Sequence, residues 1–240
     1  MKRKLNVCLT PDLYNYYNND NNITVVVDIL RATTVISTAF HYGVKEIIVV
    51  SSLDEASKYL NKDNYIVAAE RNAQPLEGFD YGNSPFQYMN NEVKDKTLVL
   101  TTTNGTKSIK IARDAVVITS SYVNIDAVFN YIMNSKRDVV ILCAGWKGLV
   151  NMEDSIFAGN LSDKILSSSN FQTSCDSTLL VKELYKSAGG DLFTFLKPSA
   201  HRERLKHLDM EEDTRFCLKP TFSSEIVPYL LEDKLIPNII

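Results

Sequence analysis

The chain is organised around residues 65–85, Tyr65-Ile66-Val67-Ala68-Ala69-Glu70-Arg71-Asn72-Ala73-Gln74-Pro75-Leu76-Glu77-Gly78-Phe79-Asp80-Tyr81-Gly82-Asn83-Ser84-Pro85. The first five residues are apolar and predict a buried strand, and Ser84-Pro85 predicts the start of a helix. A turn needs glycine, proline and asparagine, but it does not need Glu70, Arg71 and Asp80 at the carboxyl end of a strand. Because ligands bind at that edge of an open α/β sheet, we predict an active-site loop here; a purely architectural turn is the alternative.

The same arrangement occurs earlier in the chain. Ile23-Thr24-Val25-Val26-Val27 is continuously apolar and β-branched, which predicts a strand covered on both faces. Asp28 and Arg31 follow at its carboxyl end, before a helix that we expect to begin near Thr33 and end at Gly43. In the alternative interpretation, Asp28 only caps this helix and pairs with Arg31 at the surface.

Further apolar runs extend this pattern. They predict strands at residues 46–50, 97–101, 116–119 and 139–142, with helices at about 52–60, 106–112 and 125–133. Alternating strands and helices predict an α/β fold with three α/β/α layers and a mainly parallel sheet. The C-terminal third is predicted to be mainly helical, at about 178–188 and 199–208, with a final strand pair or sheet edge at 216–227.

No segment of the sequence has the composition of a linker. We therefore expect a single domain over residues 1–240, with a subdivision near residues 170–176 as the alternative. The composition is 45% hydrophobic and 23% charged, with a net charge of -3, which is ordinary for a soluble globular protein and argues against nucleic acid as the main partner. No apolar run approaches the roughly 20 residues of a membrane span, and whether the chain forms a homo-oligomer stays open.

The cysteines indicate a reducing environment. Cys8, Cys143, Cys175 and Cys217 show neither the paired spacing of a zinc site nor that of a disulfide framework. We therefore expect a cytoplasmic location.

A second polar loop follows the predicted strand at 97–101. Thr102-Thr103-Asn104-Gly105-Thr106-Lys107 offers neutral donors at a strand-to-helix junction, which suits a phosphate or sulfonate. The spacing of a Walker loop is absent. A simple turn that uses Gly105 for a positive φ angle is the alternative.

Two acidic residues lie at the start of a later helix. Glu153 and Asp154 follow the strand at 139–142, and the helix dipole explains only one of them. We expect Asp154 to lie at the carboxyl edge of the sheet. Further on, residues 199–205 are polar and basic enough to face a ligand, although a solvated helix face would have the same composition.

These strand ends should meet along one edge of the sheet. Carboxylates gathered there repel one another unless a cation lies between them, and the absence of a His/Cys set favours Mg²⁺ over zinc. Arg31, Arg71 and a helix N-terminus supply what an anionic phosphoryl group needs. The residues therefore predict a Mg²⁺-dependent enzyme that acts on a small phosphorylated or otherwise anionic metabolite.

The chain also resembles the 2-phosphosulfolactate phosphatases, in sequence blocks that follow one another along nearly its whole length. The blocks are Val27-Asp28-Ile29-Leu30-Arg31-Ala32-Thr33-Thr34, Glu70-Arg71-Asn72, Gly78-Phe79-Asp80-Tyr81-Gly82-Asn83-Ser84-Pro85, Thr101-Thr102-Thr103-Asn104-Gly105-Thr106, Cys143-Ala144-Gly145, Glu153-Asp154 with Ala158-Gly159, Ser199-Ala200-His201 and Asp213-Thr214-Arg215-Phe216-Cys217. The resemblance implies Mg²⁺-dependent hydrolysis of 2-phospho-3-sulfolactate to 3-sulfolactate and phosphate, a step toward coenzyme M. One departure is Ala73, where glycine is more usual.

The resemblance also implies roles for individual residues. The metal ligands, direct or through water, would be Asp28, Glu70, Asp80 and Asp154. The substrate would be bound by Arg71, Asn83, Thr102, Thr103, Asn104, Gly105 and Thr106. The catalytic residues would be Asp28, Arg31 and His201, with Arg31 also binding the phosphate or the sulfonate. Asp28 would either activate water or attack phosphorus itself, and His201 would either protonate the leaving alkoxide or be structural.

Two other functions remain open. A Mg²⁺-dependent hydrolase of another small anionic phosphoester would use the same residues. A non-catalytic module that binds an anionic metabolite would need the arginines and the threonine loop, but it has little use for four acidic residues at one edge.

Overall fold

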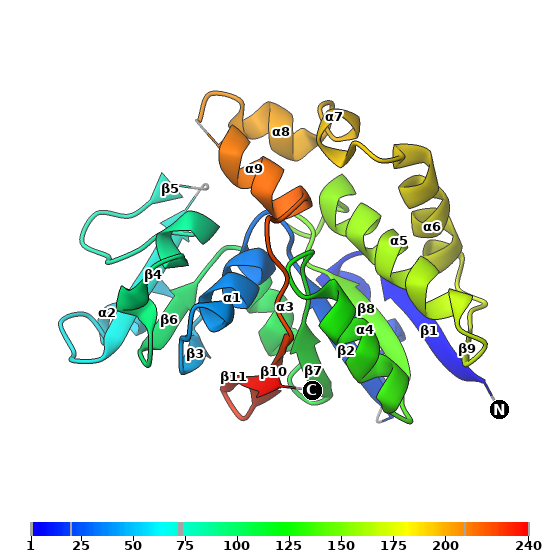
Figure 1. Cartoon of the computed structure of the whole chain (residues 1–240), viewed down its shortest axis with the longest axis horizontal. Coiled ribbons are helices and arrows are strands. Elements are labelled where there is room, and N and C mark those ends of the chain that lie inside the picture. The colour runs from blue at the N-terminus through cyan, green and yellow to red at the C-terminus, as the bar shows by residue number, and fades with distance from the viewer. Residues whose placement is uncertain (1, 20, 72–73, 209, 240) are drawn as a thin grey trace.

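The computed structural model describes residues 2–19, 21–71, 74–208 and 210–239 (Figure 1). The strands within these residues are β1 (Arg3–Cys8), β2 (Asn22–Val27), β3 (Glu46–Val49), β4 (Tyr65–Arg71), β5 (Gln74–Pro75), β6 (Thr97–Thr101), β7 (Val116–Thr119), β8 (Asp138–Cys143), β9 (Phe171–Gln172), β10 (Ile226–Leu231) and β11 (Lys234–Ile239). The α-helices are α1 (Ala32–His41), α2 (Leu53–Ser57), α3 (Gly105–Ile111), α4 (Ile125–Asn134), α5 (Met152–Ser167), α6 (Asp176–Ala188), α7 (Leu192–Phe195), α8 (Ala200–Leu205) and α9 (Glu211–Leu218). Short 3₁₀ helices are η1 (Pro11–Tyr16), η2 (Pro85–Tyr88) and η3 (Asn91–Val93).

The described strands form one sheet in the order β5-β4-β6-β3-β11-β10-β7-β2-β8-β1-β9. The pairs β4–β6, β3–β6, β2–β7, β2–β8, β1–β8 and β1–β9 are parallel. The predicted fold class, α/β with a mainly parallel sheet and a helical C-terminal third, is therefore confirmed. The sequence analysis did not identify β1, which pairs with both β8 and β9.

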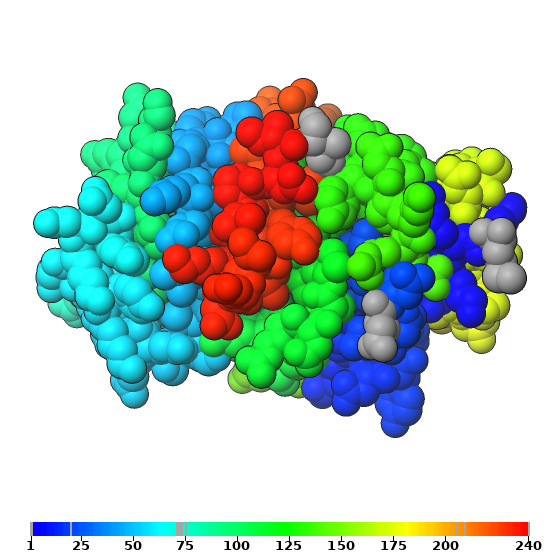
Figure 2. All heavy atoms as spheres, turned by 90° about the horizontal axis from the view of Figure 1, so that it is seen from below, coloured from blue at the N-terminus to red at the C-terminus, as the bar shows by residue number. Residues whose placement is uncertain are grey.

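The C-terminal strands differ from the prediction. Phe216 lies in α9, and the strand pair is β10 with β11, which lies in the middle of the sheet, where it pairs antiparallel with β7 and β3. Figure 2 shows this C-terminal segment in red at the centre of the lower face. Pro228 and Pro237 discourage a strand prediction, but they are register partners within the hairpin.

The burial of β2 explains why its apolar run forms a central strand. Successive side chains of a strand point to opposite faces of the sheet. Val25 and Val27 belong to an apolar cluster with residues of α4 and α5, whereas Val26 belongs to a second cluster with residues of α1 and α3. All three are fully buried, so both faces of β2 are covered. This burial fixes β2 between β7 and β8 and places Asp28 at the carboxyl edge.

The helices α8 and α9 lie above this carboxyl edge (Figure 1). They bring residues from the last fifth of the chain to the ends of β2, β4, β6 and β8. Among the described residues, no helix has the length and apolar character needed to cross a membrane.

Candidate active site

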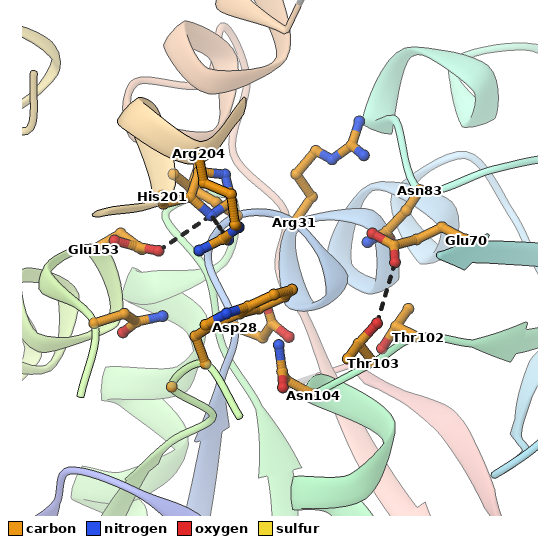
Figure 3. Close-up of a pocket in the computed structure, with 14 residues that line it drawn as sticks. Asp28, Arg31, Glu70, Asn83, Thr102, Thr103, Asn104, Glu153, His201 and Arg204 are labelled. Carbon is orange, nitrogen blue, oxygen red and sulfur yellow. Dashed lines mark hydrogen bonds and ion pairs between the residues drawn. The ribbon is translucent and has the colours of Figure 1, made fainter. Parts of the chain in front are cut away.

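A pocket lies at the carboxyl edge of the sheet, beneath α8 (Figure 3). The space between its walls, including the part that is open to solvent, is about 490 Å³. The lining residues are Asp28, Leu30, Arg31, Glu70, Asn83, Thr102, Thr103, Asn104, Gly145, Trp146, Asn151, Glu153, His201 and Arg204. The loops after β2, β6 and β8 and the end of β4 thus meet here, as the sequence predicts for parallel strands.

Asp28 lies in the middle of the pocket, directly after β2 (Figure 3). Burial raises the pKa of its carboxyl group well above the ordinary value, and the negative charges of Asp154 and Glu70 raise it further. A Cβ on Gly105 would lie 2.8 Å from Asp28 Oδ2, so only glycine lets α3 begin this close to the carboxylate. Gly105 does not have a positive φ angle, which rules out the alternative explanation for that glycine. The pocket thus holds a carboxylate that a proton or a cation would stabilise.

Arg31 lies at the start of α1 and is tied to α9. Its guanidinium donates to Asp213 in a buried ion pair. The other carboxylate oxygen of Asp213 accepts a hydrogen bond from Ser84 Oγ at 2.7 Å. The arginine is therefore held in the pocket by a residue that is 182 positions away in the sequence.

The side of the pocket formed by β4 and β6 carries neutral groups and one acid (Figure 3). Thr103 Oγ1 donates to Glu70 Oε1 at 3.4 Å. Asn83 is 5% exposed, and its Oδ1 is buried without a hydrogen-bond partner. The amide oxygen of Asn104 accepts from the backbone N–H of Lys147 at 3.3 Å. Buried unpartnered polar atoms are rare, so Asn83 Oδ1 is available to a ligand or to water.

The opposite side carries a second acid and the α8 residues (Figure 3). Glu153 is 3% exposed, and its Oε1 lies 3.4 Å from His201 Nδ1. Burial and the charge of Asp154 raise the pKa of Glu153 to about 7. Burial, and then the nearby arginines, lower the pKa of His201 to about 3. At neutral pH the imidazole is therefore uncharged, and the proton of this pair is held by Glu153 for much of the time.

Two predicted metal ligands lie away from the pocket lining. Asp154 is fully buried; it accepts from the backbone N–H of Ile29 at 2.8 Å and of Gly145 at 3.1 Å, and from Asn151 Nδ2 at 2.9 Å. It therefore joins the loops after β2 and β8. Asp80 is exposed and accepts from the backbone N–H of Val67 at 2.8 Å.

The other predicted site residues lie partly in the pocket and partly outside it. The predicted residues that line the pocket are Asp28, Arg31, Glu70, Asn83, Thr102, Thr103, Asn104 and His201. Gly105 and Thr106 belong to α3, and Thr106 bonds back to Thr102. The side chain of Arg71 and the residues Asn72 and Ala73 lie outside the described part of the chain.

Sequence reasoning missed Trp146 and Asn151 as pocket residues, placed Arg204 only within the segment 199–205 that could face a ligand, and favoured Asp154 over Glu153. A signal existed for Arg204, because it lies three residues after His201 and therefore on the same face of a helix. The Asp213–Arg31 pair left no local signal in the sequence.

The donor set of the pocket fits a hydrated Mg²⁺ ion better than a tightly caged one. Among the described residues, no three His, Cys, Asp or Glu side chains are close enough together to hold a metal ion by themselves. However, Asp28, Glu70 and Glu153 all line the pocket, and Glu153 Oε2 is buried without a partner. Mg²⁺ commonly uses one or two carboxylates and keeps several waters, so these residues fit it.

The fold and the pocket together define a site for a small anionic molecule at the carboxyl edge of an α/β sheet. The comparison with known proteins gives the family. A protein-family model with the description "2-phosphosulpholactate phosphatase" matches residues 8–233 of the chain. The chain belongs to the 2-phosphosulpholactate phosphatase family, a family named for a phosphoric monoester hydrolase.

Several curated relatives cover most of the chain. A protein of Caldanaerobacter subterraneus subsp. tengcongensis is 40% identical over 227 residues, which is 90% of this chain and 93% of the relative. One of Thermotoga petrophila is 37% identical over 193 residues, covering 80% and 82%. One of Clostridium novyi is 36% identical over 200 residues, covering 82% and 84%. Each of the three is named "Probable 2-phosphosulfolactate phosphatase". The predicted family resemblance is confirmed.

Proposed function

We propose that the chain is a Mg²⁺-dependent phosphatase that hydrolyses 2-phospho-3-sulfolactate to 3-sulfolactate and phosphate. The observation that carries the proposal is the carboxylate of Asp28, which lies in the middle of a pocket that also presents Arg31, Glu70 and Glu153. This combination supports phosphoryl chemistry, because a carboxylate can act on water or phosphorus while a guanidinium binds phosphoryl oxygens. The names of the relatives support the choice of substrate.

Asp28 is placed to begin the reaction. Its raised pKa suits a general base that takes a proton from water as the water oxygen bonds to phosphorus and the ester P–O bond breaks. In the second route, which the geometry leaves equally open, the Asp28 carboxylate bonds to phosphorus as the ester P–O bond breaks and the alkoxide leaves, and water then hydrolyses the acyl phosphate to phosphate and free Asp28. Arg31 binds phosphoryl oxygens in both routes, and its pair with Asp213 fixes its position.

The Glu153–His201 pair is placed to end the reaction. The leaving alkoxide needs a proton, and a carboxylic acid with a pKa of about 7 holds one at neutral pH. We assign this proton to Glu153, with His201 orienting the acid or passing its proton to the leaving oxygen. A Mg²⁺ ion held by Asp28 and Glu70, partly through water, would neutralise charge on the phosphoryl oxygens.

We also propose that this reaction is a step toward coenzyme M and that the protein is cytoplasmic. The four cysteines are free thiols, which agrees with a reducing compartment.

Phosphate release from 2-phospho-3-sulfolactate tests the proposal. Purified protein should release phosphate with Mg²⁺, lose the activity in EDTA and regain it when excess Mg²⁺ is restored. The restoration is the control against damage by the chelator. If folded protein releases no phosphate in Mg²⁺, the substrate assignment fails, and a panel of small phosphoesters then separates another phosphatase from a non-catalytic binding protein.

A further inference from the structure

Arg204 is a pocket residue to which the mechanism above gives no role. It reaches into the pocket from α8, beside His201 (Figure 3). Its guanidinium carbon lies 3.7 Å from the centroid of the Trp146 ring, and Nη2 lies 3.3 Å from His201 Nδ1. Its Nε is buried and has no hydrogen-bond partner. Glu153 and Glu70 act on the Arg204 charge from a distance, but among the described residues no carboxylate forms a close ion pair with it, so at least one donor, Nε, remains unused.

The loop that carries the indole under this guanidinium is itself held firmly. The backbone N–H of Trp146 donates to the carbonyl of Leu149 at 2.8 Å, and the reverse bond measures 2.9 Å. Gly145 allows this tight loop, since a Cβ there would lie 2.4 Å from the Leu149 carbonyl oxygen. Stacking on an aromatic ring fixes the plane of an arginine and leaves its N–H edge free to donate.

The contrast with Arg31 shows what Arg204 is suited to bind. Arg31 shares its charge with Asp213 in a close buried pair, whereas the close partners of Arg204 are a ring and an uncharged imidazole. The carboxylates of Glu153 and Glu70 act on Arg204 only from a distance. A partly buried cation without a directly paired counter-charge is costly, and an arriving anion offsets that cost. Three carboxylates line the pocket and repel a polyanionic substrate. Cationic groups are therefore needed beside each oxyanion of such a substrate.

The position of Arg204 indicates which oxyanion this is. Arg204 lies next to the Glu153–His201 pair, which protonates the leaving oxygen in the proposed reaction. The part of the substrate that carries this oxygen must therefore lie on the α8 side, with the phosphoryl group toward Asp28. In 2-phospho-3-sulfolactate that part carries a sulfonate and a carboxylate.

We propose that Arg204, stacked on Trp146, forms a subsite that binds an oxyanion of the leaving group and so makes the enzyme prefer phosphoesters with a second negative group. This subsite rests on the proposed function, which supplies the direction in which the substrate lies. Sulfonate and carboxylate share the chemistry that the guanidinium recognises, and substrate analogues separate them.

Four phosphoesters test the subsite by kcat and KM. They are 2-phospho-3-sulfolactate, 2-phospholactate without the sulfonate, O-phosphoisethionate without the carboxylate, and ethyl phosphate without either. R204Q should lower kcat/KM on the full substrate by roughly 100-fold, the loss expected for a charge-assisted contact, and mainly through KM. On ethyl phosphate the loss should be far smaller. The analogue that R204Q affects as little as ethyl phosphate lacks the group that Arg204 binds.

Three further variants make the test specific. R204K keeps the charge but not the planar fork, so it should recover only part of the lost affinity. W146L keeps the arginine without its platform and should raise KM in the same substrate order. R202Q is the matched control, because Arg202 lies on the same helix, 4.1 Å over Phe193, and does not line the pocket. Its kinetics should follow the wild type on all four esters.

Several outcomes overturn the subsite. Equal losses on all four esters would place Arg204 at the transferred phosphoryl group, and no loss on any ester would remove it from binding. If the wild type hydrolyses none of them, the proposed function fails separately, and calorimetric binding of 3-sulfolactate decides the subsite instead. Binding that R204Q weakens at least tenfold, and R202Q does not, supports it; equal binding, or none by the wild type, overturns it.

Discussion

Asp213 on α9 holds Arg31 at the end of β2 and, through its second carboxylate oxygen, holds Ser84 at 2.7 Å. One side chain from the C-terminal helices therefore positions both Arg31, a cation of the pocket, and the loop that follows β4. The pair is nearly buried, with the Arg31 and Asp213 side chains 7% and 12% exposed. Its removal should affect both stability and catalysis.

Asp213→Asn should lower the free energy of unfolding by about 3 kcal/mol, the low end for breaking a buried ion pair. It should also lower kcat/KM at least tenfold, because Arg31 loses the contact that orients it. Urea unfolding and steady-state kinetics measure the two effects. Ser84→Ala is the matched control, since it removes only the second hydrogen bond and should cost about 1 kcal/mol. Unchanged kinetics in Asp213→Asn would show that Arg31 does not depend on this contact.

Asp28→Asn should abolish turnover and at the same time stabilise the metal-free protein at high pH. Burial and neighbouring acids raise the pKa of Asp28 in the folded state above its unfolded value. The folded protein therefore holds this proton more tightly, and it loses stability as the pH rises through the folded pKa. At a pH below the pKa of Asp28 in the unfolded state, the carboxyl group is protonated in both states. Ionisation of residue 28 then causes no difference in stability between the wild type and Asp28→Asn.

Melting temperatures in EDTA between pH 5 and pH 8.5 measure the effect. The advantage of Asp28→Asn should grow with pH, and added Mg²⁺ should reduce it by stabilising only the wild type. Parallel curves for the two proteins would contradict a raised pKa at Asp28, whereas retained turnover would remove Asp28 from the mechanism.

The strands that were predicted from the sequence have continuous apolar runs, and most of them pair with other strands that also have such runs. The run in β2 is buried on both faces, so its composition alone identifies it. The hairpin β10–β11 was misplaced because it contains Pro228 and Pro237 and joins the sheet between strands far away in sequence. Its insertion depends on long-range pairing that local patterns do not encode.

The pocket residues that directly follow strands were predictable for the same reason, because parallel strands bring their carboxyl ends together. The choice between Glu153 and Asp154 was not, since adjacent helical residues point about 100° apart and only packing decides which of them faces the pocket. In the structure, Asp154 accepts hydrogen bonds from backbone N–H groups of two loops, and Glu153 lines the pocket.

Gly105→Ala should damage the site by overpacking. The new Cβ would lie 2.7 Å from Ala32 Cβ and 2.8 Å from Asp28 Oδ2, so α3 or the end of β2 must shift. We expect a loss of about 1–3 kcal/mol in stability and a lower kcat. Gly190→Ala is the control, because no atom lies within 4 Å of its added Cβ. Thermal unfolding and kinetics compare the two, and equal behaviour would show that the close approach at Gly105 is not required.

Glu153→Gln should remove a pH dependence as well as activity. The pKa of Glu153 is raised to about 7, so the protonated acid is present below that pH and is lost as the pH rises through it. If this acid protonates the leaving oxygen, wild-type kcat on 2-phospho-3-sulfolactate should fall above about pH 7.

The Glu153→Gln variant cannot donate that proton. Its kcat should be lower by roughly 10²- to 10⁴-fold, and the fall above pH 7 should be absent. Phosphate release from pH 5.5 to 9 at saturating substrate and Mg²⁺ measures both effects. If the fall persists unchanged in Glu153→Gln, another group supplies the proton. The same pH profile measured on His201→Gln then decides whether that group is the imidazole. A fall near pH 7 is not expected from His201, because its pKa is lowered to about 3.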